Sequence, residues 1–271
     1  MKIGFLGGGK MAEALISGLG KSAKVVVSDV DPKRLRLLKS KYKVSTAGSN
    51  REAYNSAEVV IIAVKPQHVT EVLEELRGKK EESGKRNTGR KLVISIAAGI
   101  PISYLQKKLP GCQIIRTMPN NPVLVGQGIT AIAKGPLVTR YSLLVTKRIF
   151  SAVGEVIEVP EKWLDAVTGL SGSGPAFVYL VMEALTEGGV AQGLPFAVAE
   201  KLAVQTVIGA AQTAKQTVHS MKTLRQMVAS PGGTTIEGLA VLEKFKLVEA
   251  LSGAVRAAAK KSQVLSARWG Q

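Results

Sequence analysis

The chain contains 271 residues, enough for one large or two modest domains, and its content of 45% hydrophobic and 21% charged residues excludes a mostly disordered protein. Its 37 Lys and Arg against 20 Asp and Glu give a net charge of +17, so nucleic acid, a membrane surface or a small anionic ligand must be considered as a partner. The single cysteine, Cys112, excludes an intramolecular disulfide and a multi-cysteine metal site, and it favours a reducing cytoplasm as the compartment.

The first part of the chain alternates strand-like and helix-like patterns. Short apolar runs, largely β-branched as in buried parallel strands, occupy residues 3–6, 25–27, 59–64 and 92–96. Stretches that suit crossover helices lie between them, at residues 11–18, 32–40, 51–55 and 69–76. Further strands are expected at residues 113–116, 128–133 and 155–159, with another helix at 141–150. We therefore predict an α/β domain over residues 1–160, with a Rossmann-like, doubly wound and mainly parallel sheet.

The composition changes near residue 160, and the remainder reads as helices separated by Gly and Pro. Apolar residues recur at helical spacing over residues 177–191, 197–214 and 247–258, which predicts an all-α second domain over residues 161–271. These helices are rich in Ala and Gly, which allow close helix packing, and the sequence leaves open whether that packing is internal or forms a dimer interface. The long uncharged stretch at 166–182 is interrupted by Ser, Thr, Gly and Pro, so no transmembrane helix is expected.

A glycine-rich segment directly follows the first predicted strand. Residues 7–12 fit the pattern G-x-G-x-x-A between a strand and a helix, the context in which this pattern indicates dinucleotide binding. Glycine is required at Gly7 and Gly9 because a side chain would block the tight turn or the approach of a pyrophosphate. The helix that opens with Lys10 and Met11 would hold the anion with its amides and dipole. We expect these four residues to bind cofactor; a plain glycine turn is the alternative.

The end of the second predicted strand bears on the choice between NADH and NADPH. Asp29 lies where a carboxylate accepts hydrogen bonds from an adenosine ribose and repels a 2′-phosphate. Ser28, Lys33 and Arg34 favour the opposite choice, because they can donate to or neutralise that phosphate. An N-cap or Asx turn before Pro32 explains Asp29 equally well. The cofactor expected from these residues is therefore NAD(P)H.

The ends of the next two strands supply candidate walls for a nicotinamide ring. One wall consists of Ala63, Val64, Lys65 and Pro66, and the other of Ala97, Ala98 and Gly99. Both segments follow strands whose carboxyl ends face the ligand crevice of this fold. A simple strand-to-helix turn is the alternative for each.

Two segments of the second domain resemble anion-binding helix starts. Residues 169–175 read Gly-Leu-Ser-Gly-Ser-Gly-Pro, and residues 230–235 read Ser-Pro-Gly-Gly-Thr-Thr. Both can present unpaired backbone amides and hydroxyls to a carboxylate, although ordinary helix capping is the alternative.

The two histidines share no metal-ligand spacing, and no catalytic triad or carboxylate pair stands out, so no metal site is expected. Hydride transfer fits this chain because the cofactor supplies the reactive carbon.

Together these motifs resemble one known family over nearly the whole chain. The matching segments are residues 7–12, 63–67, 116–122, 169–175 with 187–189 and 193–195, and 230–236. In order and spacing they are similar to pyrroline-5-carboxylate reductase. The resemblance implies an oxidoreductase that reduces 1-pyrroline-5-carboxylate to L-proline with NAD(P)H, the last step of proline biosynthesis. It also implies a Rossmann-like domain followed by an all-α dimerisation domain, and dimers that assemble into a decamer.

The resemblance also assigns roles to particular residues. It implies that Ser230, Gly232, Gly233 and Thr234 hold the substrate carboxylate, and that Thr235 reaches the ring nitrogen as the catalytic residue. It further implies that Asn50 contacts the cofactor and that Val64, Lys65 and Pro66 lie along the nicotinamide ribose.

Two other functions remain open from the sequence. One is a related dehydrogenase acting on another imine or on a β-hydroxyacid, and the more remote one is an NAD(P)-sensing protein that binds nucleic acid. The basic residues cluster at 77–91, a stretch that contains seven Lys and Arg and only two acidic residues, Glu81 and Glu82. This stretch lacks the interleaved aromatic residues that stack on bases, so a solvated loop is the favoured interpretation and neither nucleic acid nor membrane is expected as a partner.

Overall fold

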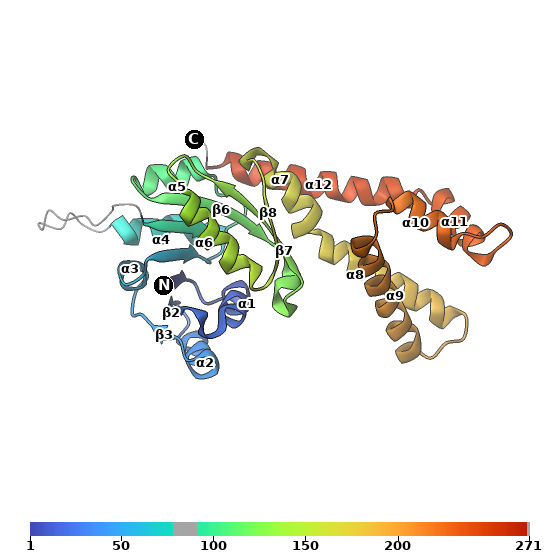
Figure 1. Ribbon diagram of the computed structural model, residues 1–271, viewed down its shortest axis with the longest axis horizontal. Helices are drawn as coiled ribbons and strands as arrows, with labels where there is room; N and C mark the ends of the chain where they lie inside the picture. The colour runs from blue at the N-terminus through green and yellow to red at the C-terminus, as the bar shows by residue number, and fades with distance from the viewer. Residues whose placement is uncertain (78–90, 270–271) are drawn as a thin grey trace, which may run out of the picture. The chain divides into compact units, whose positions relative to one another are not determined.

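The computed structural model describes residues 1–77 and 91–269 (Figure 1). The basic cluster therefore lies outside the described residues except for its two ends. Contacts between Cα atoms divide the chain into two compact units. Unit 1 comprises Met1–Ser173 and Ala257–Gln271, and unit 2 comprises Gly174–Arg256. The predicted domain boundary at residue 160 remains a proposal about how the chain is organised.

Unit 1 is built on one eight-stranded sheet with the strand order β3-β2-β1-β4-β5-β6-β7-β8. The strands are β1 Lys2–Leu6, β2 Lys24–Ser28, β3 Ser45–Thr46, β4 Val59–Ile62, β5 Leu92–Ser95, β6 Gln113–Pro119, β7 Gly128–Lys134 and β8 Gly154–Glu158. Pairing is parallel from β3 through β6, β7 runs antiparallel to β6, and β8 is parallel to β7. The first six strands have the Rossmann order, which confirms the predicted doubly wound, mainly parallel fold.

Helices cover both faces of this sheet (Figure 1). They are α1 Lys10–Leu19, α2 Pro32–Tyr42, α3 Asn50–Asn55, α4 Val69–Arg77, α5 Ile102–Lys108, α6 Arg140–Ser151 and α7 Leu164–Val167. The short β3, α5 and α7 were not predicted from the sequence. Short single turns complete the connections: η1 Gly20–Ser22, η2 Pro66–His68, η3 Asn121–Val125, η4 Glu161–Trp163 and η5 Thr168–Gly172.

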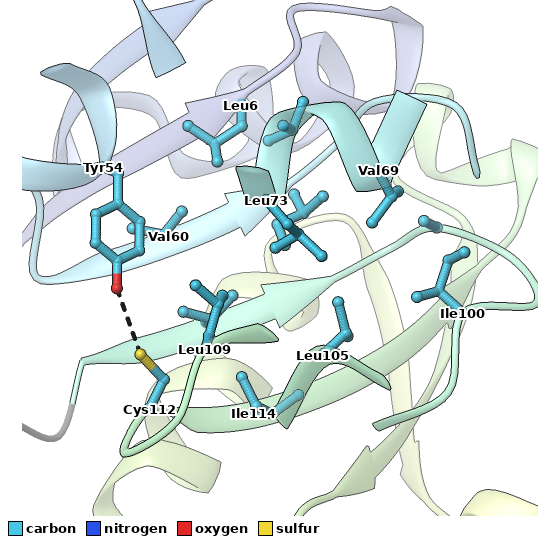
Figure 2. Packing of buried hydrophobic residues seen from close by; sticks show 14 of the residues in the cluster. Leu6, Tyr54, Val60, Val69, Leu73, Ile100, Leu105, Leu109, Cys112 and Ile114 are labelled. Carbon is cyan, nitrogen blue, oxygen red and sulfur yellow. Dashed lines mark hydrogen bonds between the residues drawn. The ribbon is translucent and has the colours of Figure 1, made fainter. Parts of the chain in front are cut away.

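The alternation of side chains along each strand creates two buried clusters, one on each face of the sheet. In β1, Phe5 belongs to the cluster that contains Leu15 of α1 and Phe150 of α6. The next residue, Leu6, belongs to the other cluster, with Leu73 of α4. Figure 2 shows that second cluster. Because both faces of β1, β2, β4 and β5 are buried, these strands contain apolar runs rather than alternating apolar and polar residues.

The second half of the chain is helical, as predicted. Its helices are α8 Gly174–Ala191, α9 Phe196–Gln216, α10 Met221–Val228, α11 Thr234–Lys244 and α12 Leu247–Ala267. Helices α8 and α9 pack against each other in unit 2, where Gly189 lies so close to Ala199 that an added Cβ would be 3.1 Å from the alanine Cβ. Helix α12 begins in unit 2 and its last turns belong to unit 1.

Candidate functional site

The candidate cofactor residues of unit 1 follow strands that end side by side. The amide of Ala63, after β4, donates to the carbonyl of Leu6 at the end of β1 over 2.8 Å. The amide of Ile96, after β5, donates to Ile62 of β4 over 3.2 Å. The strand order reverses between β1 and β4, and crevices at such switch points bind ligands in open α/β sheets.

The glycine-rich turn begins directly at the end of β1. Gly7 has a φ of +101°, and a Cβ there would lie 2.8 Å from the carbonyl oxygen of Ala63, so both the backbone conformation and the close approach of β4 require glycine. Gly9 differs because a Cβ there would meet no atom within 4 Å. The protein's own packing therefore leaves space beside Gly9.

This space lies at the start of α1. Gly9 is the N-cap of α1 and supplies no side-chain cap, so the first amides of the helix have no side-chain acceptor at that position. Lys10 is exposed and Met11 is half-buried in the first turn. An uncapped helix start with open space in front of it fits the pyrophosphate of a dinucleotide.

Asp29 adopts the local structure that the sequence allowed as the alternative to ribose binding. Its Oδ1 accepts the amide of Asp31 over 2.8 Å, which forms an Asx turn. Asp31 then caps α2 by accepting the amide of Lys33 over 2.8 Å, with Pro32 in the first turn. The other oxygen of Asp29 accepts the amide of Gly8 over 2.6 Å.

Asn50 opens α3, and its amide group is held from two sides. Its Nδ2 donates to Glu75 Oε2 over 2.6 Å, and its Oδ1 accepts the hydroxyl of Ser28 over 2.7 Å. A carboxylate can only accept, so Glu75 determines which end of the Asn50 amide faces it. Ser28 is only 3% exposed and contacts Asn50 rather than the protein surface. Any contribution of Ser28 to cofactor binding therefore acts through Asn50.

The two candidate walls for the nicotinamide differ in exposure. Ala63, Val64 and Pro66 are half-buried and Lys65 is exposed, so this segment is open to a ligand. In the other segment Ala97 is 3% exposed and Ala98 is half-buried. Gly99 has a φ of +77°, and its missing side chain would point at Leu265 of α12, 3.4 Å away. Gly99 is thus required for its backbone conformation and lies against α12.

The residues at 116–122 that contribute to the family resemblance have structural contacts. The hydroxyl of Thr117 donates to the carbonyl of Ser95 over 3.1 Å and ties β6 to β5. Asn120 Oδ1 accepts the amide of Ile129 over 2.9 Å and fixes the start of β7. These contacts explain the motif without assigning it a ligand.

In unit 2 the segment at 230–235 leads into α11. Gly232 has a φ of +69°, which favours glycine, and the amide of Gly233 donates to the carbonyl of Ser230 over 3.0 Å. Gly233 is the N-cap of α11 without a side-chain cap, Thr234 is exposed and Thr235 is half-buried. Of its three hydroxyl residues, Ser230 and Thr234 are exposed, so the segment presents them and a helix start to solvent, which suits a small carboxylate.

The other glycine-rich segment, at 169–175, does not have the predicted form. It is helical: Thr168–Gly172 forms a π-helix, and the amide of Ser173 donates to the carbonyl of Thr168 over 2.9 Å. A Cβ on Gly172 would lie 2.7 Å from Met118 Cε, so this glycine packs closely against the end of a side chain of β6. The prediction of free amides in this segment was wrong because tertiary packing outweighs the low helix propensity of glycine.

The helices of unit 2 carry many exposed apolar side chains. The large ones with at least 50% exposure on α8 and α9 are Tyr179, Leu180, Leu185, Phe196 and Leu202. Apolar faces of this kind are typical of surfaces that pack against another protein.

The described residues contain no candidate metal site and no membrane helix. No group of three or more His, Cys, Asp or Glu within residues 1–77 and 91–269 is placed to hold a metal ion. In the same part of the chain, no helix is long and apolar enough to cross a bilayer.

Comparisons with known proteins agree with the two-part organisation. Residues 161–265 match the family described as "Pyrroline-5-carboxylate reductase dimerisation", and residues 2–99 match the one described as "NADP oxidoreductase coenzyme F420-dependent". The chain is 46% identical to a pyrroline-5-carboxylate reductase of Synechocystis over 98% of both chains, and 41% identical to one of Methanosarcina acetivorans over 97% of both.

Solved structures give the same result. A pyrroline-5-carboxylate reductase from Coxiella burnetii matches with a TM-score of 0.88 and 37% identity, covering 97% of this chain and 98% of that one. The Plasmodium falciparum enzyme, solved with NADP bound, matches with a TM-score of 0.86 and 30% identity over 98% of both chains.

Proposed function

Because the chain belongs to the pyrroline-5-carboxylate reductase family, we propose that it reduces 1-pyrroline-5-carboxylate to L-proline with NAD(P)H, the last step of proline biosynthesis. The observation that carries this proposal is the 46% identity to a curated reductase over 98% of the chain. This nearly full-length similarity includes residues 7–12 and residues 230–235, so it covers the residues expected to bind the cofactor and the substrate.

The cofactor would be held by the glycine-rich turn and the strand ends beside it. The open space at Gly9 and the uncapped start of α1 suit the pyrophosphate, and Asn50 and the segment Ala63 to Pro66 lie at the same carboxyl edge of the sheet. When bound, NAD(P)H supplies the hydride that reduces the imine carbon. No metal is proposed for this reaction.

The substrate would be held by the segment at 230–235. The amides at the start of α11 and the hydroxyls of Ser230 and Thr234 can donate to the substrate carboxylate, with open space beside Gly232 and with Gly233 close to the Ser230 side chain. We assign the half-buried Thr235 to the ring nitrogen. Its hydroxyl would orient the protonated imine, whose positive charge makes the adjacent carbon electrophilic.

The protein self-associates through its dimerisation domain, whose family matches residues 161–265. Apolar side chains exposed on α8 and α9 supply a suitable surface. We further propose that dimers assemble into a decamer and that the enzyme acts in the cytoplasm, without nucleic acid as a partner. Mass measurement of the purified protein in solution tests the decamer.

The test of the proposed function is to follow the oxidation of NADH and of NADPH in parallel, with pyrroline-5-carboxylate as substrate. We expect turnover with formation of L-proline. A β-hydroxyacid with the oxidised cofactor and a different cyclic imine serve as controls. If one of these controls is turned over far faster than pyrroline-5-carboxylate, the proposed substrate is wrong.

A further inference from the structure

Both backbone polar groups of Gly8, the middle glycine of the glycine-rich turn, are hydrogen-bonded to charged side chains. The amide of Gly8 donates to Asp29 Oδ2 over 2.6 Å, and the carbonyl of Gly8 accepts from Arg34 Nε over 2.8 Å. Both partners lie more than 20 residues away, just after β2 and in α2. Asp29 and Arg34, which the sequence suggested could contact the adenosine ribose or its phosphate, are therefore hydrogen-bonded to the backbone of the turn.

Both oxygens of Asp29 take part in these contacts. While Oδ2 accepts from Gly8, Oδ1 accepts the amide of Asp31 over 2.8 Å. The carboxylate thus bridges the turn after β1 and the turn after β2. Because each oxygen accepts a backbone amide, the orientation of the Asp29 carboxylate is set by the two turns that it joins.

Arg34 is fixed at the other end of its guanidinium group. Its Nη2 lies 2.9 Å from Glu13 Oε2, and Glu13 Oε1 accepts from Lys41 Nζ and from the hydroxyl of Tyr42, each over 3.1 Å. The side chains of Arg34 and Glu13 are only 21% and 14% exposed. Arg34 is therefore held between the turn and a paired carboxylate, which leaves it little freedom to reach a phosphate.

Packing supports the same conclusion for Gly8 itself. A Cβ there would lie 2.9 Å from Leu38 Cδ1 of α2 and 3.3 Å from Asp29 Oδ2. In the pattern G-x-G-x-x-A, Gly8 is the first x, where any residue type is allowed. The close contact with Leu38 and Asp29, rather than the pattern, therefore favours a residue without a side chain at this position. Leu38 of α2 thus packs against Gly8, while Asp29 and Arg34 hold its amide and its carbonyl.

We propose that Asp29 and Arg34 are positioning residues that fix the two peptide groups flanking the Gly8 Cα and so preform the cofactor turn, and that neither one distinguishes NADH from NADPH. This inference rests on the proposed function, because it concerns the cofactor of that reaction. The proposal predicts that loss of either side chain weakens the binding of NADH and the binding of NADPH by the same factor.

The test measures the dissociation constants of NADH and NADPH for Asp29→Ala and Arg34→Gln. Asp29→Ala removes two hydrogen bonds made by a charged group and Arg34→Gln affects three, so we expect both constants to rise on the order of 10-fold, with their ratio within about twofold of wild type. Arg36→Gln is the matched control, because Arg36 is exposed on the same helix, and it should leave both constants unchanged. If Asp29→Ala weakens the binding of NADH alone, or Arg34→Gln weakens the binding of NADPH alone, that residue distinguishes the two cofactors and the proposal is overturned.

A second measurement does not depend on bound cofactor. Hydrogen exchange of the amides at residues 7–11 in the cofactor-free protein should become faster in Asp29→Ala and Arg34→Gln but not in Arg36→Gln. Unchanged exchange in both variants would overturn the proposal. If Asp29→Ala does not fold, Arg34→Gln and Glu13→Gln still test it, since Glu13→Gln removes the charge that anchors Arg34.

The proposed function and the role of Asp29 and Arg34 are contradicted by different results. A wild-type protein that binds NAD(P)H but does not reduce pyrroline-5-carboxylate would contradict the proposed function, while the ratio of cofactor affinities in the variants would still decide the role of Asp29 and Arg34. A wild-type protein that binds neither cofactor would also contradict the proposed function, and hydrogen exchange would then decide whether the two side chains hold the turn.

Discussion

Arg116 Nη1 lies 3.2 Å from Glu161 Oε1, and the arginine is only 5% exposed within β6. Its Nη2 lies 4.0 Å from Asp165 Oδ1. The same Asp165 oxygen accepts the hydroxyls of Ser262 and Ser266 in the last turns of α12, over 2.6 and 3.0 Å. A single buried cation therefore supports the carboxylate that attaches the end of α12 to the sheet.

We predict that Arg116→Met destabilises the protein. The change removes the hydrogen bond of the buried Arg116 to Glu161, a charge-assisted bond that typically contributes about 2 kcal/mol to the free energy of unfolding. Denaturant titration measures this loss. Lys147→Gln, which removes an exposed partner of Glu158, should cost less than about 1 kcal/mol. Equal effects of the two changes would show that the Arg116 network is not a buried one in solution.

Glu75 should affect cofactor binding although it was not predicted from the sequence. Glu75→Gln replaces an acceptor by an amide that can present a donor to Asn50, so the orientation of the Asn50 side chain is no longer determined. We expect the KM for NAD(P)H to rise several-fold, with a smaller change in kcat. Glu74→Gln, on the neighbouring residue of α4, is the control. A kcat loss without a KM change would contradict this positioning role.

Thr235→Ala should reduce turnover. The hydroxyl oxygen would accept a hydrogen bond from the protonated ring nitrogen, and losing one hydrogen bond to a charged group costs on the order of 10- to 100-fold in rate. Steady-state kinetics with pyrroline-5-carboxylate measure the effect, and Thr235→Ser should recover most of it because it keeps the hydroxyl. If kcat and KM of Thr235→Ala both equal the wild-type values, the assignment to the ring nitrogen is wrong.

Glu13 should make stability depend on pH in the acid range. Burial raises its pKa, but hydrogen bonds from Arg34, Lys41 and Tyr42 outweigh burial and lower the pKa from 4.5 to about 2. Because the folded protein holds the carboxylate ionised, its contribution to stability is fully present above pH 4.5 and is lost as the pH falls toward about 2.

The measurement compares unfolding free energies of wild type and Glu13→Gln at about pH 6 and about pH 3. The variant should be less stable at the higher pH, and the difference should shrink at the lower pH. A difference that stays constant between the two conditions would contradict the lowered pKa of Glu13.

Self-association should depend on the apolar faces of unit 2. Leu180 on α8 is 64% exposed, and Leu180→Glu places a charge on a surface that we expect to be buried between subunits. We predict a shift toward the monomer in sedimentation experiments at low micromolar concentration. Leu144→Glu, at a residue 56% exposed on α6, is the matched control and should not change the mass. An unchanged mass for Leu180→Glu would place the interface elsewhere.

Local pattern was sufficient for the Rossmann-like sheet, the helical second half and the glycine-rich turn. Apolar runs and their periodicity depend on the nearest residues along the chain, and the backbone conformation required at Gly7 is also local. The sequence alone therefore determined the fold class and the family, and it indicated where a dinucleotide would bind.

Only the tertiary structure decided what the charged residues around that turn do. Arg34, Glu13 and Glu75 act on partners 21 to 26 residues away, a separation at which no sequence pattern specifies contact. It likewise decided that residues 168–172 are helical rather than a loop, because Gly172 packs against Met118 of a distant strand. Propensity and periodicity are properties of neighbouring residues, whereas hydrogen-bond partners and close packing are set by the folded arrangement of the chain.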